Sequence, residues 1–418
     1  MAAGRVGTPS ASVVSAQDIA RARVAIGDVA RHTPVLTSST LGERYGGDVV
    51  LKAESLQRTG SFKIRGALNK LAALGDACAS GVVCGSAGNH AQALALAARA
   101  RGVPCEVFMP EGAPIAKVEA TTALGARVVV GGGSVDDCVT LARARAAEAG
   151  LAFVHPFDDP DIVAGQGTLG LELLEDLADL ATVIVPVGGG GLASGLAIAV
   201  KSARPDVRVV GVQVEAVAAY PASLKAGAPV AVDAGLTIAD GIAVKRPGDL
   251  TLPLIQRWVD DVVVVPEDEV AEAMVLLMEK AKLVVEGAGA VGVAALLGGQ
   301  VRPAEHGSTC VILSGGNVDA GLLATIARRH ETEAGRRLVL LTRVPDRPGA
   351  LAQLLNCVAE EGANIMEVSH MREGIGLHVR ETGVQLTIET RSSEHARAVI
   401  DAIQSAGYGV AQYPAAAG

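Results

Sequence analysis

The sequence is poor in aromatic residues and has no closely spaced cysteine pair. Phe, Tyr and Trp make up 2% of the 418 residues, so any hydrophobic core must be built from Ala, Val, Leu and Ile. The six cysteines form no C-x-x-C pair, and none has metal-ligand spacing to a histidine. Most lie in apolar runs, which predicts buried free thiols in a reducing, cytoplasmic compartment.

An excess of positive charge and a usable membrane span are also missing. The net charge of −9 argues against a nucleic-acid partner, because such partners require a basic surface. Residues 181–200 are uncharged and long enough to cross a bilayer, but four successive glycines would break a spanning helix. Residues 1–20 lack an apolar segment of signal-peptide length and are predicted to be a frayed tail. We therefore expect a soluble protein with no membrane partner.

What is abundant is short apolar runs that alternate with Ala-rich helical stretches. Half of the residues are hydrophobic and 50 are glycines, in a chain long enough for two or three domains. This alternation predicts a doubly wound parallel α/β fold with its ligand at the carboxyl ends of the strands. The predicted strands are 47–54, 81–86, 105–110, 126–132, 152–157, 182–188, 207–215, 261–269 and 309–317. The clearest predicted helices are 90–101, 136–149, 165–179, 191–203 and 267–282.

A second kind of unit follows a charged stretch near residue 330. We predict a main domain over 1–330, a linker over 331–337 and a small domain over 338–418. The small domain has the βαββαβ order of the ferredoxin-like motif. Its predicted elements are strand 338–344, helix 348–361, strands 363–371 and 383–390, helix 393–406 and a short last strand.

Three strand ends in the main domain carry candidate ligand-binding residues. Gly188–Gly191 follows a strand and opens a helix, which suits a phosphate cradle and equally a tight turn. In "CGSAGNHAQ", Ser86 and Asn89 are candidates to cap the next helix or to flank a bound carboxylate. His90 is a candidate general base, although a core histidine is the commoner case. The third strand end carries "SGGN", which begins at Ser314.

Lys63 is unusual because it lies between Phe62 and Ile64, just after a Gly-Ser turn and at the start of a predicted helix. It is either a surface charge or a buried amine. The sequence has no G-x-S-x-G motif and no clear pair of catalytic carboxylates. A buried lysine suits Schiff-base chemistry, and together with a phosphate cradle it meets the requirement for pyridoxal phosphate (PLP).

Four motifs in this order, "SFKIRGA", "SAGNHAQ", "VGGGGL" and "SGGN", resemble those of fold type II PLP enzymes, and most closely the threonine/serine dehydratases (threonine ammonia-lyases). The resemblance covers about residues 18–330. It implies a tryptophan synthase β-like fold of two parallel-sheet subdomains, the smaller one at about 54–155. "VPDRPGALAQLL" and "GANIMEVSH" resemble an ACT domain, an amino-acid-sensing module.

The resemblance also implies a role for each motif residue. Lys63 would bind the cofactor covalently and then act as the base at Cα, with Phe62 packed against the pyridine ring. Asn89 would bond the 3′-hydroxyl, and Ser314 would face the pyridine nitrogen. The phosphate loop would be Gly188, Gly189, Gly190, Gly191 and Leu192. The substrate would contact Ser86, Ala87, Gly88, Asn89, His90 and, within segment 237–244, Gly241.

Two departures separate the chain from the similar serine racemases. Ala87 replaces a serine that acts as the second acid/base in those enzymes, so we expect feeble racemisation. Glu215 is retained at their cation site, but Pro221 stands where an aspartate ligand is expected, so we predict no metal.

The predicted reaction is PLP-dependent α,β-elimination of L-threonine to 2-oxobutyrate and ammonia, in isoleucine synthesis or threonine breakdown. L-Serine is an expected further substrate. The alternatives are an L-serine or hydroxyaspartate dehydratase and an amino-acid-sensing protein with a vestigial PLP site. Gly349 and Asn364 are the predicted effector residues, with isoleucine or valine as effector. The resemblance further implies a homotetramer or homodimer.

Overall fold

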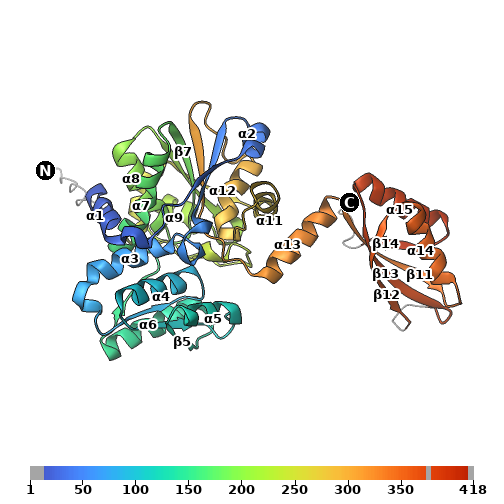
Figure 1. Ribbon diagram of the computed structural model, residues 1–418, viewed down its shortest axis with the longest axis horizontal. Helices are drawn as coiled ribbons and strands as arrows, with labels where there is room; N and C mark the ends of the chain where they lie inside the picture. The colour runs from blue at the N-terminus through green and yellow to red at the C-terminus, as the bar shows by residue number, and fades with distance from the viewer. Residues whose placement is uncertain (1–13, 373–377, 413–418) are drawn as a thin grey trace, which may run out of the picture. The chain divides into compact units, whose positions relative to one another are not determined.

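The computed structural model describes residues 14–372 and 378–412 (Figure 1). It divides the chain into two compact units, Met1–Val318 and Asp319–Gly418. Each unit has its own sheets and its own hydrophobic core. Of the tail predicted over 1–20, residues 1–13 lie outside the described part of the chain.

The larger sheet of the first unit has six strands in the order β1-β2-β10-β7-β8-β9. Neighbours from β2 to β9 are parallel, and β1 is antiparallel to β2. The strands are β1 (Val35–Thr37), β2 (Asp48–Ala53), β7 (Leu180–Pro186), β8 (Arg208–Val214), β9 (Asp261–Val265) and β10 (Ser308–Leu313). The five parallel strands were predicted. Strand β1 was missed because three residues are too few to show a periodicity.

Helices cover both faces of this sheet (Figure 1). Val183 and Val185 of β7 pack in one core with helices α7 (Pro160–Asp176) and α8 (Gly191–Ala203). Ile184, which points the other way, lies against Gly292 of helix α12 (Gly287–Leu297). The unit also contains α1 (Ala16–Ile26), α2 (Ser39–Tyr45), α9 (Ala219–Ala226), α10 (Thr251–Trp258) and α11 (Glu267–Leu276), which continues as a π-helical turn over Leu277–Ala281.

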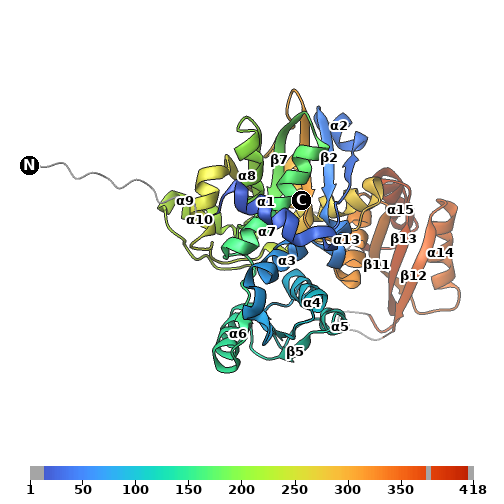
Figure 2. The same ribbon diagram turned by 60° about the vertical axis from the view of Figure 1, so that its left-hand side comes forward.

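The smaller sheet is entirely parallel, in the order β5-β4-β3-β6, and forms a separate layer (Figure 2). Its strands are β3 (Val82–Gly85), β4 (Cys105–Met109), β5 (Arg127–Val130) and β6 (Ala152–Phe153). Its helices are α4 (Asn89–Arg101), α5 (Ile115–Ala123) and α6 (Val135–Ala149). Helix α3 (Lys63–Leu74) contacts both α4 and α7, so it joins the two layers. A Cβ on Gly165 of α7 would lie 2.6 Å from the Cα of Gly66, so these glycines allow a close approach.

The second unit has the predicted βαββαβ order, with an antiparallel sheet β12-β13-β11-β14. Its elements are β11 (Arg337–Pro345), α14 (Ala350–Glu360), β12 (Asn364–Met371), β13 (Glu381–Glu389), α15 (Ser393–Ser405) and β14 (Val410–Gln412). Leu340, Leu386 and Ile388 of the sheet are buried with Leu354 and Val399 of the two helices. The ferredoxin-like fold predicted for this unit is confirmed.

The stretch predicted as a linker is structured. Residues 331–337 contain the end of helix α13 (Ala320–Glu333) and the first residue of β11, and the division between the units falls after Val318. Arg329 and Glu333 are exposed and form an i,i+4 ion pair of 2.7 Å. Ion pairs of this spacing stabilise helices that are exposed to solvent. A run of charged residues is therefore as typical of a surface helix as of a linker, and composition alone could not distinguish the two.

The uncharged run 181–200 is not a continuous helix. It contains most of β7, the glycine turn and most of α8. Among the described residues, no helix combines the length and the apolar character needed to cross a membrane. All six cysteines are free and five of them are buried, as predicted.

Candidate active site

Lys63 begins helix α3 because the chain before it is held against the loop after β10. Thr59 and Gly60 have φ of 62° and 70°, which produces a tight turn. The N–H of Phe62 then donates to the Ser314 carbonyl at 3.1 Å. The "SFKIRGA" and "SGGN" motifs therefore meet in space, although some 250 residues separate them in the chain.

The Lys63 amine lies in a packed environment. Its Nζ donates to the Pro156 carbonyl at 2.9 Å and lies 5.2 Å from the ring centroid of Phe62. Burial lowers the pKa of the amine to about 8, and the nearby Glu286 opposes this shift. Roughly a tenth to a fifth of the amine is therefore neutral near physiological pH, far more than for an ordinary lysine. The residue is partly buried, so Lys63 is not a free surface charge.

The glycine loop Gly188–Gly191 joins β7 to α8 with its backbone tightly confined. A Cβ on Gly189 would overlap the ring of Phe157, and Gly190 has φ of 94°. The Gly189 carbonyl accepts hydrogen bonds from Thr251 Oγ1 at 2.6 Å and Tyr220 Oη at 3.1 Å. No side chain caps the start of α8. The N–H groups of its first turn, including that of Leu192, therefore remain available to an anion.

The segment from Ser86 to His90 forms the start of helix α4, but neither Ser86 nor Asn89 caps that helix as expected. Gly88 occupies the N-cap position without a side-chain cap. Ser86 Oγ accepts instead from the N–H of Gly88 at 3.2 Å, outside the first turn. The uncapped helix end beside Ala87 suits a carboxylate ligand.

His90 does not have the properties of a general base. It is 3% exposed, and its Nε2 lies 3.2 Å from the Val154 carbonyl. Burial, followed by the positive charge of Lys63, lowers its pKa to about 3, so the ring stays neutral. His90 is a core histidine whose ring is bonded to the backbone.

Asn89 takes part in a hydrogen-bonded chain of side chains. Its Nδ2 donates to Glu286 Oε1 at 2.7 Å, and its Oδ1 accepts from Asn317 Nδ2 at 2.7 Å. Ser314 is 3% exposed, and among the described residues its hydroxyl makes only a long 3.5 Å hydrogen bond, to the Ala288 carbonyl. Gly241 also belongs here, since a Cβ on it would lie 2.9 Å from Ala288 Cβ.

Several residues that line this region were not predicted. Glu286, 5% exposed, has its pKa raised to about 7 by burial and then by the charge of Asp240. His155 accepts from the N–H of Asp158 at 2.8 Å through Nδ1, and burial lowers its pKa to about 4. The only sequence signal for Glu286 was its position, a single carboxyl between an apolar run and the small residues "GAGA".

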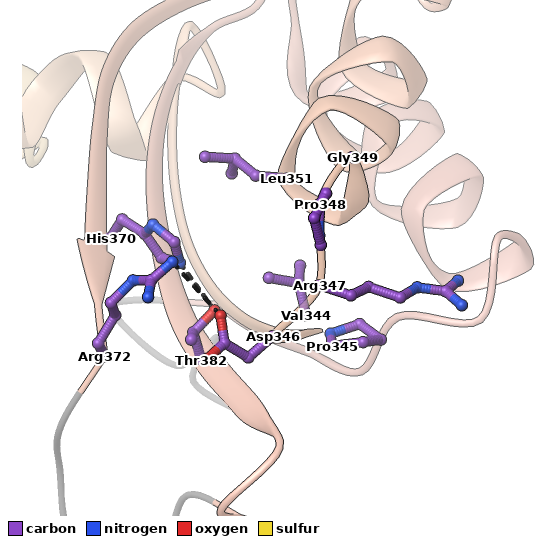
Figure 3. Close-up of a pocket in the computed structure, with 10 residues that line it drawn as sticks. All are labelled: Val344, Pro345, Asp346, Arg347, Pro348, Gly349, Leu351, His370, Arg372 and Thr382. Carbon is purple, nitrogen blue, oxygen red and sulfur yellow. Dashed lines mark hydrogen bonds and ion pairs between the residues drawn. The ribbon is translucent and has the colours of Figure 1, made fainter.

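The second unit has a pocket of its own, of about 260 Å³ (Figure 3). On the wall of the pocket formed by the sheet, His370 and Thr382 are hydrogen bonded at 2.8 Å, and Arg372 lies 3.4 Å from Asp346. It is lined by Val344, Pro345, Asp346, Arg347, Pro348, Gly349, Leu351, His370, Arg372 and Thr382.

Of the two predicted effector residues, Gly349 lines this pocket and Asn364 does not. Asn364 begins β12, whereas His370 and Arg372 are at the other end of that strand, roughly 20 Å away at 3.3 Å per residue. Asn364 Nδ2 donates to Glu389 at 3.0 Å instead. A role of Asn364 in effector binding stays a prediction, and it would require a site other than this pocket.

Residues 26–315 match the family described as pyridoxal-phosphate dependent enzyme. The chain belongs to this family.

The relatives agree on the fold of the first unit. An L-threonine ammonia-lyase of Thermotoga maritima is 44% identical over 399 residues, which cover 95% of this chain and 99% of the relative. A solved T.th. threonine deaminase superimposes with a TM-score of 0.69 at 42% identity, over 73% of this chain and 99% of that one. Maize serine racemase gives a TM-score of 0.72 at 36% identity, over 77% and 99%. The first unit is thus a fold type II PLP enzyme with parallel sheets.

The residues of the site fit this cofactor. The glycine loop is packed too closely against Phe157 and Tyr220 to carry side chains, and the start of α8 has no side-chain cap, so its first N–H groups can bind an anion such as a phosphate. The amine of Lys63, with a lowered pKa, is suited to bond an aldehyde carbon. Lys63, Asn89, Ser314 and the glycine loop come from different parts of the chain, and the fold gathers them at the carboxyl ends of strands.

Proposed function

We propose that this protein is an L-threonine ammonia-lyase, which converts L-threonine to 2-oxobutyrate and ammonia. The observation that carries the proposal is the confined amine of Lys63, close to Phe62 and to the loop that contains Ser314. The names of the Thermotoga maritima relative and of the solved T.th. deaminase support threonine as the substrate.

The cofactor, when bound, supplies an electron sink that makes the Cα–H bond of an attached amino acid acidic. Lys63 then provides the base. Because burial lowers the pKa of its amine to about 8, Lys63 can accept a proton near neutral pH, which an ordinary lysine cannot do efficiently. Its position at the start of a rigid helix keeps the amine close to the cofactor.

The proposed carboxylate site is the backbone from Ser86 to His90. The uncapped N-terminus of α4 supplies N–H donors and the positive end of the helix dipole. Gly241 lies across the site, in the turn Asp240–Ile242. Lys117 of the smaller layer lies 2.9 Å from Asp240, and this ion pair connects the two sides.

Ser314 supports elimination over transamination. In the proposed arrangement it faces the pyridine nitrogen, and a neutral hydroxyl does not hold a proton there as an aspartate would. A cofactor held in this way would be a weaker electron sink, which would disfavour transamination and suit elimination.

The identities of Ala87 and His90 support proton transfer at only one face of the substrate Cα. Ala87 has no titratable group, and His90 is neutral and bonded to Val154. Lys63 is then the only base that we assign at Cα. Racemisation, the activity named for the maize relative, is expected to be feeble in this protein.

We also propose that the second unit is an ACT domain that binds an amino-acid effector at the pocket beside Gly349. Gly349 has φ of 87° and directly precedes α14 as its N-cap. The pocket contains one acidic and two guanidinium side chains, which suits a zwitterion. Isoleucine is the expected inhibitor if the enzyme serves isoleucine synthesis, with valine as a counter-effector; a catabolic enzyme would ignore both. A homodimer or homotetramer and a cytoplasmic location belong to the same proposal.

One kinetic experiment tests these assignments. L-Threonine, L-serine and hydroxyaspartate are each assayed for 2-oxo acid formation, with and without isoleucine. We expect the highest kcat/KM with threonine, a lower value with serine, and a change in threonine kinetics when isoleucine is added. A preference for serine or hydroxyaspartate would reassign the substrate, and no turnover of any of them would favour a sensor with a vestigial site.

A further inference from the structure

Glu286 is a buried carboxyl for which the proposed reaction has no use. It lies at the N-terminal end of α12, with its N–H donating to the Gly315 carbonyl at 3.1 Å. A Cβ on Gly315 would overlap its Oε1. The first glycine of the "SGGN" motif, Gly315, therefore leaves room for this carboxyl. As a result Glu286 lies directly beside the motif that contains Ser314.

The contacts of Asn317 determine how the amide of Asn89 is oriented. Asn317 Nδ2 lies 2.6 Å from the Thr59 carbonyl, which can only accept, so that atom of Asn317 is the donor nitrogen. The same nitrogen lies 2.7 Å from the Asn89 side chain, so the atom it meets there is Oδ1. The nitrogen of Asn89 consequently faces Glu286, whose Oε1 accepts at 2.7 Å.

This arrangement leaves one donor for a ligand. Glu286 takes one of the two Nδ2 protons of Asn89, and no other residue in the described part of the chain is bonded to the second. Burial raises the pKa of Glu286 to about 7, yet either form of the carboxyl can accept the first proton. Glu286 and Asn317 thus hold both ends of one amide.

We propose that Glu286 is a positioning residue, which together with Asn317 fixes the Asn89 amide so that its free N–H donates to the 3′-oxygen of the cofactor. This inference rests on the proposed placement of the cofactor beside Lys63. Without Glu286, the amide is held only through its Oδ1 by Asn317, so its nitrogen is no longer fixed toward the 3′-oxygen.

The test compares Glu286→Ala, which removes the acceptor, with Glu286→Gln, which keeps an oxygen of the same reach but no charge. The holoenzyme of each variant is examined for the ratio of its long- and short-wavelength cofactor absorption bands. The apparent Kd of the apoenzyme for pyridoxal phosphate is measured by absorbance titration. Glu286→Ala is expected to change the band ratio and to weaken binding about tenfold, with Glu286→Gln within about threefold of wild type.

A third variant covers the case in which Glu286→Ala fails to fold. Asn317→Asp keeps the shape but removes the donor that fixes Asn89, so it is expected to change the band ratio in the same direction. Unchanged bands and affinity in Glu286→Ala, or in Asn317→Asp where the former is unfolded, would overturn the inference. Glu286→Gln as defective as Glu286→Ala would also overturn it, since charge rather than orientation would then be the cause. If the wild-type protein shows no cofactor absorbance that depends on Lys63, the proposed function fails instead.

Discussion

The chemistry of the first unit depends on how single residues are perturbed by their surroundings. Burial moves the pKa of Lys63 down to about 8 and that of Glu286 up to about 7. Burial also keeps His90 and His155 neutral. These shifts bring both Lys63 and Glu286 into the range where a group can exchange a proton near neutral pH, and Lys63 is the one to which we assign the reaction.

The lowered pKa of Lys63 predicts how the rate of cofactor attachment depends on pH. Only the neutral amine reacts with the aldehyde, so the rate constant should rise about tenfold per pH unit below the pKa. It should become flat above about pH 8, because most of the amine is then neutral. Stopped-flow absorbance of the apoenzyme mixed with pyridoxal phosphate measures this rate. A rise that continues toward 10.5, the ordinary lysine value, would contradict the account.

At the scale of elements, the site depends on short connections between strands and helices. The loop between β7 and α8 is confined by Phe157 on one side and by Tyr220 and Thr251 on the other. Helix α3, which carries Lys63, is fixed by a buried ionic cluster. Arg65 bonds Glu54 and Glu172 at 2.8 and 2.7 Å, and Lys52 lies 2.9 Å from Glu172.

Gly189→Ala should weaken binding of pyridoxal phosphate by about fivefold to 150-fold, since relieving an overlap of this kind costs ~1–3 kcal/mol. The added Cβ would overlap the Phe157 ring, so the loop must shift. Gly131→Ala is the matched control: it also follows a strand, and no atom lies within 4 Å of its added Cβ. Its affinity, measured by the same absorbance titration, should stay at the wild-type value. Equal effects of the two substitutions would refute the proposal that the loop Gly188–Gly191 binds the phosphate of the cofactor.

Arg65→Met should lower the free energy of unfolding by ~3–5 kcal/mol, because it leaves Glu54 and Glu172 buried without their main partner. Arg246→Met breaks a pair of similar length, 2.7 Å to Asp249, that is largely exposed, and should cost less than ~1 kcal/mol. Chemical denaturation of both variants measures the difference. Similar losses would mean that the cluster does not anchor α3.

At the scale of the whole molecule, the parallel strands and the ferredoxin-like unit followed from sequence periodicity alone. The gathering of Lys63, Asn89 and Ser314 could be predicted only through the resemblance, since no local pattern shows which strand ends become neighbours. Glu286 was missed for that reason: it becomes informative only when Asn89 and Gly315 lie beside it. The domain boundary was misplaced because exposed charges are typical of both linkers and surface helices.

The central claim is that the amine of Lys63 carries out the reaction, and one measurement tests it directly. The initial rate of 2-oxobutyrate formation from L-threonine is compared between the wild-type protein and Lys63→Ala, both saturated with pyridoxal phosphate. Loss of the base predicts a rate at least ~10³-fold lower, with an unchanged circular dichroism spectrum. A Lys63→Ala variant that keeps its rate within about tenfold of wild type would contradict the account.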